Sequence, residues 1–298
     1  MNVLILGASG FVGGAILRDL LGEATKLSLR ALLRPMAEPR GLHPAVEVIP
    51  GDILNLRDVE NAVAGCEAVI NAVGIIAEKG KNTFENIHVK AVEYTVSASK
   101  KAGVRKYILI SALGTRAGAL SRYHQTKFAG EETLRNSGLT YTIFQPSVVF
   151  GEGDKFINLL AKLVRRSPIV PVVGNGENKF QPIWVCELAR MVRIALATDN
   201  ADGKTIKVAG KKAYTYNEIL RVIERILEIP RKPFVHLPMA LIKYPAMIFK
   251  TPINYDQWLM LQEDNIISQS DYELLVKTFG FEPSALEDVL PTYIKNVV

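Results

Sequence analysis

The first fifteen residues, MNVLILGASGFVGGA (1–15), predict a strand, a tight turn and a helix in immediate succession. Residues 3–6 form an unbroken apolar run of strand length, and Gly7 follows it directly. From Phe11 onward the apolar residues recur at helical spacing, so we expect a helix to begin there. A buried strand that runs through a glycine turn into a helix predicts an α/β fold with a parallel sheet.

The turn carries Gly7, Gly10 and Gly13 at the spacing G-x-x-G-x-x-G. Gly7 allows the tight turn, Gly10 lets a phosphate approach the backbone, and Gly13 lets the helix pack closely on the strand. The helix N-terminus points N–H groups at a diphosphate. A merely tight turn is the alternative, but the position of the glycines favours a dinucleotide site. The predicted contacts in this stretch are Gly7, Ala8, Ser9, Gly10, Phe11, Val12 and Gly13.

Arg34 follows the second predicted strand, residues 27–33, where such a sheet meets the adenosine ribose of a dinucleotide. An acidic residue there would hold both ribose hydroxyls of NAD and would repel a 2′-phosphate. No acid occupies this strand end, and a guanidinium can pair with the 2′-phosphate and stack on adenine. The sequence therefore favours NADP(H), with NAD(H) as the alternative cofactor. The competing interpretation is a surface arginine after a strand.

Two further strand ends supply candidate cofactor contacts. The strand predicted over 46–50 is followed by Asp52, whose carboxylate can accept a hydrogen bond from the adenine amino group or can cap the next helix. The strand over 67–72 ends in a segment of small residues that leaves room for the adenosine half. The candidate contacts are Gly51, Asp52, Ile53, Ala72, Val73 and Gly74.

Tyr123 and Lys127 lie four residues apart after the fifth predicted strand, 106–110, so on a helix they share one face. A lysine there can lower the pKa of the phenol and also reach the nicotinamide ribose. Ser111, at the end of that strand, can hydrogen-bond the same substrate oxygen. A lone Tyr-x-x-x-Lys often arises by chance, so the position after Ser111 carries the interpretation. The three form a Ser–Tyr–Lys arrangement for proton transfer paired with hydride transfer, and all three are also candidate cofactor contacts.

The chain changes character after the sixth predicted strand, 139–145, which places a dinucleotide-binding domain at 1–150 and a substrate lobe at 151–298. Pro146 and Val149 are the last predicted cofactor contacts. The lobe reads as smaller and mostly helical, with segments that return to the main domain. We expect helices at 84–102, 156–166 and 185–197, a strand at 204–209, and capping boxes at Thr215–Glu218 and Ser284–Glu287.

Composition and charge bear on partners and location. The 298 residues are 48% hydrophobic, enough for a full core, and a net charge of +6 spread over the chain argues against a nucleic-acid partner. Cys66 and Cys186 lie far apart and match no metal spacing, so we expect no metal and a cytoplasmic location. The apolar segment 238–250 predicts a helix packed on the domain or, alternatively, a surface that meets the inner membrane or a partner protein.

The order of these motifs resembles that of the extended and atypical short-chain dehydrogenase/reductases over nearly the whole chain. Four stretches are more narrowly similar to the NADPH-binding accessory subunit of respiratory complex I and its bacterial relatives. The resemblance implies a Rossmann-type, doubly wound parallel sheet of seven strands with a smaller C-terminal α/β lobe. It also implies NADP(H) binding, and some members of the family use the bound cofactor structurally. The four stretches are Ile87–Lys90, Pro146–Gly151, Gln181–Val185 and Thr278–Phe281.

Two residues depart from the pattern of that family. Many extended members carry Asn where His88 stands, and that Asn supports the catalytic lysine through water. His88 therefore puts the proton relay in question. The acidic residue usual near Cys186 is shifted to Glu187 or lost. Neither departure touches Tyr123 or Lys127.

Two functions of different classes follow. The first is an NADP(H)-dependent oxidoreductase, or epimerase, acting on a small carbonyl, alcohol or sugar-like substrate. Tyr123 would be the general acid/base, Lys127 its pKa-lowering and ribose-binding partner, and Ser111 the anchor of the substrate oxygen. The second is a non-catalytic NADPH-binding subunit or assembly factor of a respiratory or quinone-linked complex. We favour the first, and turnover of the bound cofactor separates the two.

Overall fold

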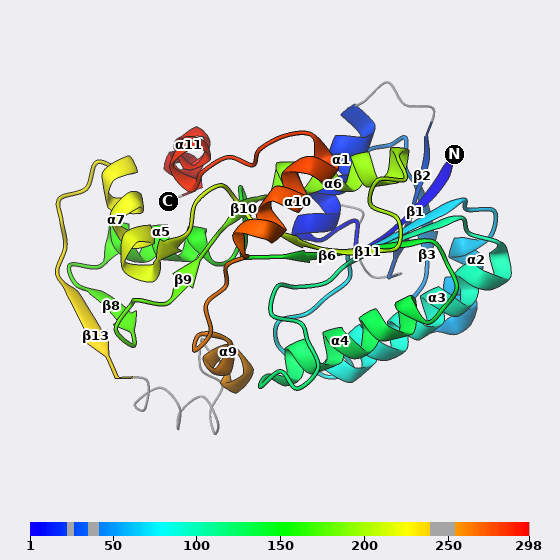
Figure 1. The fold of residues 1–298 in the computed structure, drawn as a ribbon, viewed down its shortest axis with the longest axis horizontal. Helices are drawn as coiled ribbons and strands as arrows, with labels where there is room; N and C mark the ends of the chain where they lie inside the picture. The colour runs from blue at the N-terminus through cyan, green and yellow to red at the C-terminus, as the bar shows by residue number, and fades with distance from the viewer. Residues whose placement is uncertain (23–26, 35–41, 239–253, 298) are drawn as a thin grey trace. The chain divides into compact units, whose positions relative to one another are not determined.

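The computed structural model describes residues 1–22, 27–34, 42–238 and 254–297 (Figure 1). The chain divides into two compact units, each of which takes residues from several parts of the sequence. Unit 1 comprises Met1–Pro146, Cys186–Lys207 and Lys277–Gly280, and unit 2 comprises Ser147–Val185, Val208–Val276 and Phe281–Val298.

Unit 1 is built on a seven-stranded parallel sheet in the order β11-β6-β5-β4-β1-β2-β3, which confirms the predicted Rossmann-type fold. The order reverses between β1 and β4, so the connections leave these two neighbours in opposite directions. Residues 3–6 of β1 are at most 1% exposed, because helices cover both faces of the sheet. The strands are β1 (Asn2–Leu6), β2 (Ser28–Leu33), β3 (Glu47–Pro50), β4 (Ala68–Asn71), β5 (Lys106–Ile110), β6 (Tyr141–Pro146) and β11 (Lys204–Val208).

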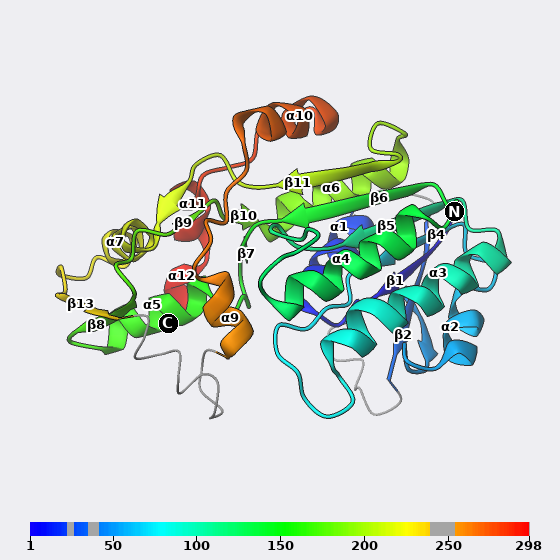
Figure 2. The ribbon, with the colours of Figure 1, turned by 60° about the horizontal axis from the view of Figure 1, so that its bottom comes forward.

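The helices of unit 1 form a layer on each face of this sheet, as Figures 1 and 2 show. One layer holds α1 (Phe11–Gly22) and α6 (Val185–Ala197). The other holds α2 (Leu56–Val63), α3 (Ala91–Ala102) and α4 (Arg122–Arg135). The doubly wound arrangement leaves the carboxyl ends of the strands as the edge where loops meet, and such sheets bind their ligands there.

The single helix expected at 84–102 is wrong in one respect, because a π-helix, η1 (Glu85–Lys90), precedes α3. The N–H of Ala91 donates to the carbonyl of Asn86, five residues back, which is the wider turn of a π-helix. The neighbours Ile87 and His88 are both buried on this segment, at 5% and 2% exposure. The π-turn therefore brings a polar side chain into the interior near the sheet edge.

Unit 2 holds three two-stranded sheets and short helices around its own apolar core. The helices α5 (Ile157–Arg166) and α7 (Tyr216–Ile226) pack against each other in that core. The sheets pair β7 (Val149–Phe150) with β10 (Ile183–Trp184), β9 (Lys179–Phe180) with β12 (Tyr214–Thr215), and β8 (Val170–Val173) with β13 (Phe234–Leu237). The remaining elements are α9 (Tyr255–Met260), α10 (Gln269–Phe279, which continues into unit 1), α11 (Leu286–Val289), η2 (Leu290–Thr292) and α12 (Ile294–Val297).

The first predicted capping box is confirmed at the start of α7. The Thr215 hydroxyl accepts from the N–H of Glu218 at 3.1 Å, and the Glu218 carboxylate accepts from the N–H of Thr215 at 2.7 Å. The two side chains thereby satisfy two backbone donors that the helix itself leaves without partners.

The second predicted box, Ser284–Glu287, is wrong by one residue. α11 has Ala285 as its N-cap, and the carboxylate of Asp288 accepts from the Ala285 N–H at 3.2 Å. Glu287 instead accepts from the hydroxyl of Tyr214, a contact between distant parts of the sequence. A tertiary hydrogen bond has therefore displaced a local one.

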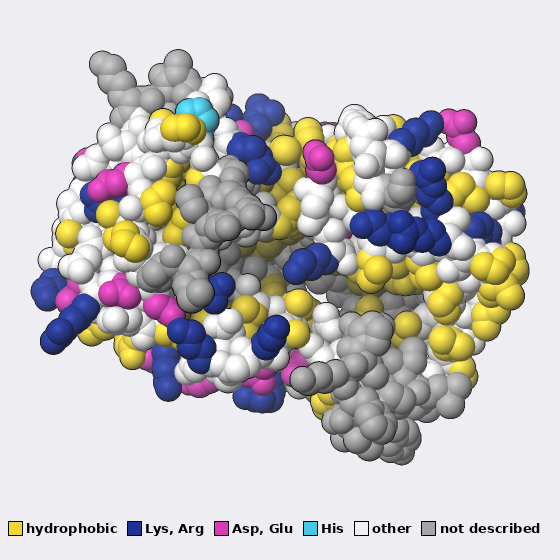
Figure 3. Space-filling view, turned by 180° about the vertical axis from the view of Figure 1, so that it is seen from behind, with side chains coloured by type: hydrophobic (Ala, Val, Ile, Leu, Met, Phe, Trp, Pro, Cys, Tyr) yellow, Lys and Arg dark blue, Asp and Glu magenta, His cyan; other side chains and the backbone are white. Residues whose placement is uncertain are grey.

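On the face in Figure 3, Lys and Arg side chains are dispersed, with Asp and Glu among them. No helix in the described part of the chain is long and apolar enough to cross a membrane. The apolar segment expected to pack or to meet a membrane falls, from residue 239 to 250, outside the described residues.

Candidate functional site

A cavity of about 270 Å³ lies in unit 1 at the carboxyl ends of β1, β2, β3 and β4. This is the edge at which a doubly wound sheet binds its ligand. The predicted cofactor contacts that line it are Gly7, Ser9, Gly10, Arg34, Gly51, Asp52, Ile53, Ala72, Val73 and Gly74. Sequence reasoning missed Leu6, Leu32, Leu33, Ile75, Asn82 and Ile87, which line it as well.

The three glycines of the turn differ in how much room a side chain would have. Gly7 adopts φ +83°, and a Cβ there would lie 3.0 Å from the backbone of Ala72. A Cβ on Gly13 would lie 2.1 Å from the Gly7 carbonyl oxygen, so Gly13 is needed for the packing of α1 on the turn. A Cβ on Gly10 would meet, among the described atoms, only that same oxygen within 4 Å, at 3.1 Å. Space therefore lies in front of Gly10, where a diphosphate would bind.

Five other predicted contacts are not among the residues that line this cavity, namely Ala8, Phe11, Val12, Pro146 and Val149. Ala8 is buried in the turn, and Phe11 and Val12 begin α1. Pro146 ends β6 in unit 1, whereas Val149 belongs to β7 of unit 2 and pairs with Ile183.

At the β2 and β3 end of the cavity, Arg34 is exposed and Asp52 carries two hydrogen bonds. The carboxylate of Asp52 accepts from the Leu54 N–H at 3.0 Å and from Lys81 Nζ at 2.5 Å. Burial raises the pKa of Asp52, but these two bonds, together with the charges of Lys81 and Arg34, outweigh it and hold the pKa below its ordinary value. Asp52 does not cap the next helix, because the side chain of Asn55 does so.

At the β4 end, Lys127 lies against the cavity wall. Its ammonium nitrogen donates to the carbonyl of Ile110 at 3.0 Å and lies 3.1 Å from where a Cβ on Gly74 would be. The side chain is only 8% exposed, and burial lowers the pKa of Lys127 to about 8. Because Gly74 lines the cavity, the Lys127 ammonium stands next to the place that a ribose would take.

Tyr123 lies one turn before Lys127 on α4, as the spacing predicts. Its ring packs edge-on against His88, with centroids 5.3 Å apart, and against Phe84 at 5.8 Å. Burial raises the pKa of Tyr123 to about 12, the opposite of the expected lowering. The Lys127 ammonium is turned to a backbone carbonyl, so the protein alone does not activate the phenol.

Ser111 follows β5, and its backbone N–H donates to the Phe144 carbonyl at 2.7 Å. Its hydroxyl is buried and has no hydrogen-bond partner in the described part of the chain. A buried hydroxyl without a partner is costly, at roughly 1–3 kcal/mol, and is rare in folded proteins. Ser111 itself is not among the residues that line the 270 Å³ cavity.

His88 joins the segment after β4 to α4. Its Nε2 accepts from the Ile75 N–H at 3.2 Å, and its Nδ1 lies 3.1 Å from the Thr126 hydroxyl. Since Nε2 accepts, the neutral ring carries its proton on Nδ1 and donates it to Thr126. Burial, together with the nearby Lys127 charge, lowers the pKa of His88 to about 2. Both ring nitrogens are engaged in hydrogen bonds within the protein, so the imidazole holds Ile75 to Thr126 and has no nitrogen left for a relay water.

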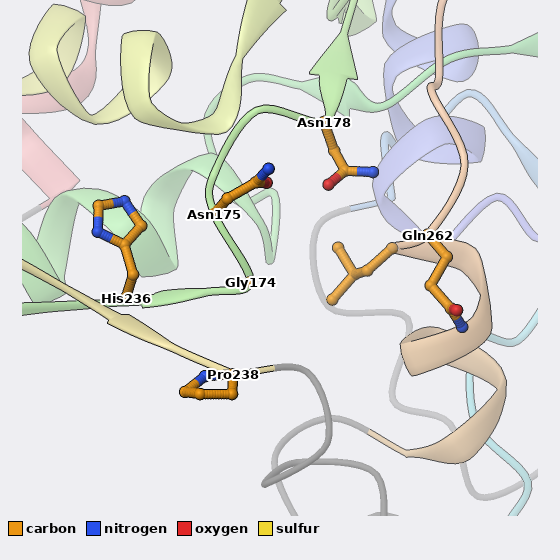
Figure 4. A pocket seen from close by; sticks show the side chains of 7 residues that line it. Gly174, Asn175, Asn178, His236, Pro238 and Gln262 are labelled. Carbon is orange, nitrogen blue, oxygen red and sulfur yellow. The ribbon is translucent and has the colours of Figure 1, made fainter.

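Unit 2 contains a separate, open cavity of about 650 Å³, shown in Figure 4. The amide side chains of Asn175 and Asn178 come from the loop between β8 and β9, and that of Gln262 from the segment after α9. His236 of β13 also lines it, and its Nε2 lies 3.3 Å from Asn217 Oδ1. None of the predicted catalytic or cofactor-binding residues lines this cavity, although Pro238, the first residue of the apolar segment 238–250, does. The polar side chains that line it follow no motif that could have marked them in the sequence.

Comparison with known proteins bears on the family of the chain. A family model described as NAD(P)H-binding matches residues 7–160. The chain is 27% identical to the mitochondrial NADH dehydrogenase [ubiquinone] 1 alpha subcomplex subunit 9 of Arabidopsis thaliana, over 89% of this chain and 71% of that protein. It is 29% identical to the subunit of the same name from Dictyostelium discoideum, over 74% and 62%.

A third relative is an enzyme. The chain is 29% identical to a ceramide reductase of Caulobacter vibrioides, over 74% of this chain and 68% of that protein. The chain thus spans 62–71% of the length of these three relatives. Among solved structures, the UDP-glucose 4-epimerase of Thermotoga maritima superposes with a TM-score of 0.76 at 17% identity, covering 99% of this chain and 98% of that one. At that identity the likeness shows the fold alone.

Proposed function

We propose an oxidoreductase function for this chain, which belongs to the NAD(P)H-binding family as an atypical short-chain dehydrogenase/reductase. The proposed reaction reduces a carbonyl, or oxidises the corresponding alcohol, with NADP(H) as the hydride carrier. The observation that carries the proposal is the place of the Lys127 ammonium beside Gly74, in the wall of the cofactor cavity. Tyr123 stands one helical turn away on the same face of α4.

Each of the three polar residues has a defined role in this proposal. The Tyr123 hydroxyl gives a proton to the carbonyl oxygen during reduction and takes it back during oxidation. An ammonium has three donors, and the Ile110 carbonyl uses one of them, so Lys127 has others for the ribose hydroxyls. Burial raises the pKa of Tyr123. The positive charges of Lys127 and of an oxidised nicotinamide would lower it, because they favour the phenolate. The Ser111 hydroxyl donates to the substrate oxygen.

We assign NADP(H) as the preferred cofactor because of the strand end at Arg34. The guanidinium lines the cavity at the end of β2 and is exposed, so a 2′-phosphate could reach it. The carboxylate of the same region, Asp52, is already bound by Lys81, which reduces its repulsion of a phosphate.

The substrate class is wider than the sequence suggests. The expectation is a small carbonyl, alcohol or sugar-like compound, and a relative named ceramide reductase adds carbonyl groups on lipids. Each of these substrates presents a C=O in the reducing direction or a C–OH in the oxidising direction, and that oxygen can bind Ser111 and Tyr123 together.

The alternative is a non-catalytic NADPH-binding subunit or assembly factor of a respiratory or quinone-linked complex. One observation favours it, namely that His88 has both ring nitrogens engaged and offers no relay for protons behind Lys127. Two of the relatives are named as subunits of NADH dehydrogenase. In that case NADPH would copurify and would not turn over.

Replacing Tyr123 by Phe tests the proposal. NADPH oxidation is followed with a panel of aldehydes, ketones, keto-sugars and keto-lipids, and NADPH affinity is titrated separately. We expect Tyr123→Phe to keep NADPH affinity and to lower turnover by about 10²–10⁴-fold. The control is Tyr141→Phe. Tyr141 lies at the amino end of β6, whereas the proposed site lies at the carboxyl ends of the strands, so this substitution should leave turnover unchanged. Turnover that survives in Tyr123→Phe would remove Tyr123 from the mechanism, and NADPH that binds without any turnover would favour the alternative.

A further inference from the structure

One ion pair in unit 1 connects two strand ends that are not neighbours in the sheet. Asp52 follows β3, and the segment that carries Lys81 follows β4. In the sheet order β4-β1-β2-β3, two other strands separate them. Nevertheless Lys81 Nζ lies 2.5 Å from Asp52 Oδ2.

The path between these ends crosses the candidate cofactor site. Adjacent strands are about 4.8 Å apart, so three spacings separate β4 from β3 by about 14 Å. The segment after β4 must therefore pass the carboxyl ends of β1 and β2 to bring Lys81 to Asp52. The glycine turn follows β1, and Arg34 follows β2. Figure 2 shows this segment as the cyan loop near the carboxyl edge of the sheet.

The segment holds Lys81 in a fixed turn. The backbones of Lys79 and Asn82 exchange two hydrogen bonds, of 3.0 and 3.1 Å. The side chain of Asn86, on η1, donates to the Lys81 carbonyl at 2.8 Å. At the other end the Ile75 N–H donates to His88. Both Ile75 and Asn82 line the 270 Å³ cavity, so the segment forms one of its walls.

We propose that residues 75–82 are a strap over the adenosine half of the dinucleotide site, and that the Lys81–Asp52 ion pair fastens it. The proposal rests on the cofactor binding proposed above and not on turnover. A dinucleotide laid from the glycine turn to Arg34 lies under this strap, and it leaves only when the ion pair opens. Lys81 is thus a positioning residue that sets how long the cofactor stays bound.

The test measures the rate at which bound NADPH leaves the protein. NADPH fluorescence is followed after mixing the complex with excess NADP⁺, for wild type, Lys81→Gln and the matched control Lys79→Gln in the same turn. The Lys81 side chain is 64% exposed, so its replacement leaves the core intact. We expect NADPH to leave Lys81→Gln about two- to fivefold faster than wild type, as the loss of an exposed ion pair allows. Lys79→Gln should release it at the wild-type rate.

A second measurement examines the strap in the wild-type protein. Hydrogen exchange of the amides in residues 75–83 should slow when NADPH binds. Equal dissociation rates in wild type and Lys81→Gln, or exchange that NADPH does not slow, would overturn the strap and leave the proposed cofactor intact. A wild-type protein that binds no NADPH would overturn both.

Discussion

At the scale of single residues, Lys127 has the clearest measurable signature. Its pKa is lowered by burial from 10.5 to about 8, so between these values the unfolded chain binds more protons than the folded protein. Stability that depends on this group therefore increases as the pH rises through that window. Below pH 8 the charged ammonium is held in the interior at full cost.

We predict that raising the pH from 7 to about 10.5 stabilises the wild type relative to Lys127→Met by about 2–3 kcal/mol. Urea unfolding of both proteins, without cofactor, at a series of pH values checks this. The difference between the two pH values cancels any constant effect of losing the bond to the Ile110 carbonyl. A difference that stays constant with pH would show that Lys127 titrates normally.

The same scale shows what the sequence could and could not predict about the site. Spacing alone was enough to place Tyr123 and Lys127 on one helical face, because i and i+4 always share a face. The environment of each group was not predictable, since burial depends on neighbours far along the chain. The Tyr123 pKa is raised by the packing of Phe84 and His88 around it, and no local motif encodes that packing.

At the scale of elements, two glycines of the turn have different roles. Gly10 faces the proposed diphosphate position, and Gly13 allows α1 to pack against the turn. A Cβ on Gly10 would meet only the Gly7 carbonyl oxygen among the described atoms, at 3.1 Å, whereas a Cβ on Gly13 would lie 2.1 Å from that oxygen. Replacing Gly10 should therefore affect NADPH binding, and replacing Gly13 should affect the stability of the fold. Their comparison distinguishes a cofactor site from a merely tight turn.

We predict that Gly10→Val remains folded and loses NADPH binding, because the branched side chain takes the space of the diphosphate. Gly13→Ala should instead destabilise the protein by at least about 2 kcal/mol, since α1 must move away from the turn. Thermal unfolding and NADPH titration of both variants provide the comparison. The glycine turn would be purely structural if folded Gly10→Val bound NADPH as wild type does.

Element boundaries were predictable where local signals act alone. Thr215 and Glu218 cap α7 through bonds between neighbours in the sequence, and the capping box predicted them. Glu287 is engaged by Tyr214, and this distant contact moved the start of α11. The π-turn before α3 also escaped prediction, because its residues have the same periodicity that a continuous α-helix would show.

At the scale of the whole molecule, most of the predicted cofactor contacts line the 270 Å³ cavity of unit 1. A parallel sheet brings the ends of its strands to one edge, so residues from positions 7 to 74 meet without any local signal between them. The Lys81–Asp52 pair could not be predicted in this way, because Lys81 belongs to no motif. The cavity of unit 2 is lined by Asn175, Asn178, Gln262 and His236, and none of them belongs to a recognised motif.

The proposed NADP(H) site depends on Arg34 at the end of β2, and titration with NADPH and with NADH tests this dependence. We predict at least tenfold tighter binding of NADPH, because a charge-assisted phosphate contact contributes about 1.5–3 kcal/mol. Arg34→Ala should abolish that preference, whereas Arg57→Ala, at an exposed position on α2, should keep it. Equal wild-type affinities for NADPH and NADH would contradict the assignment.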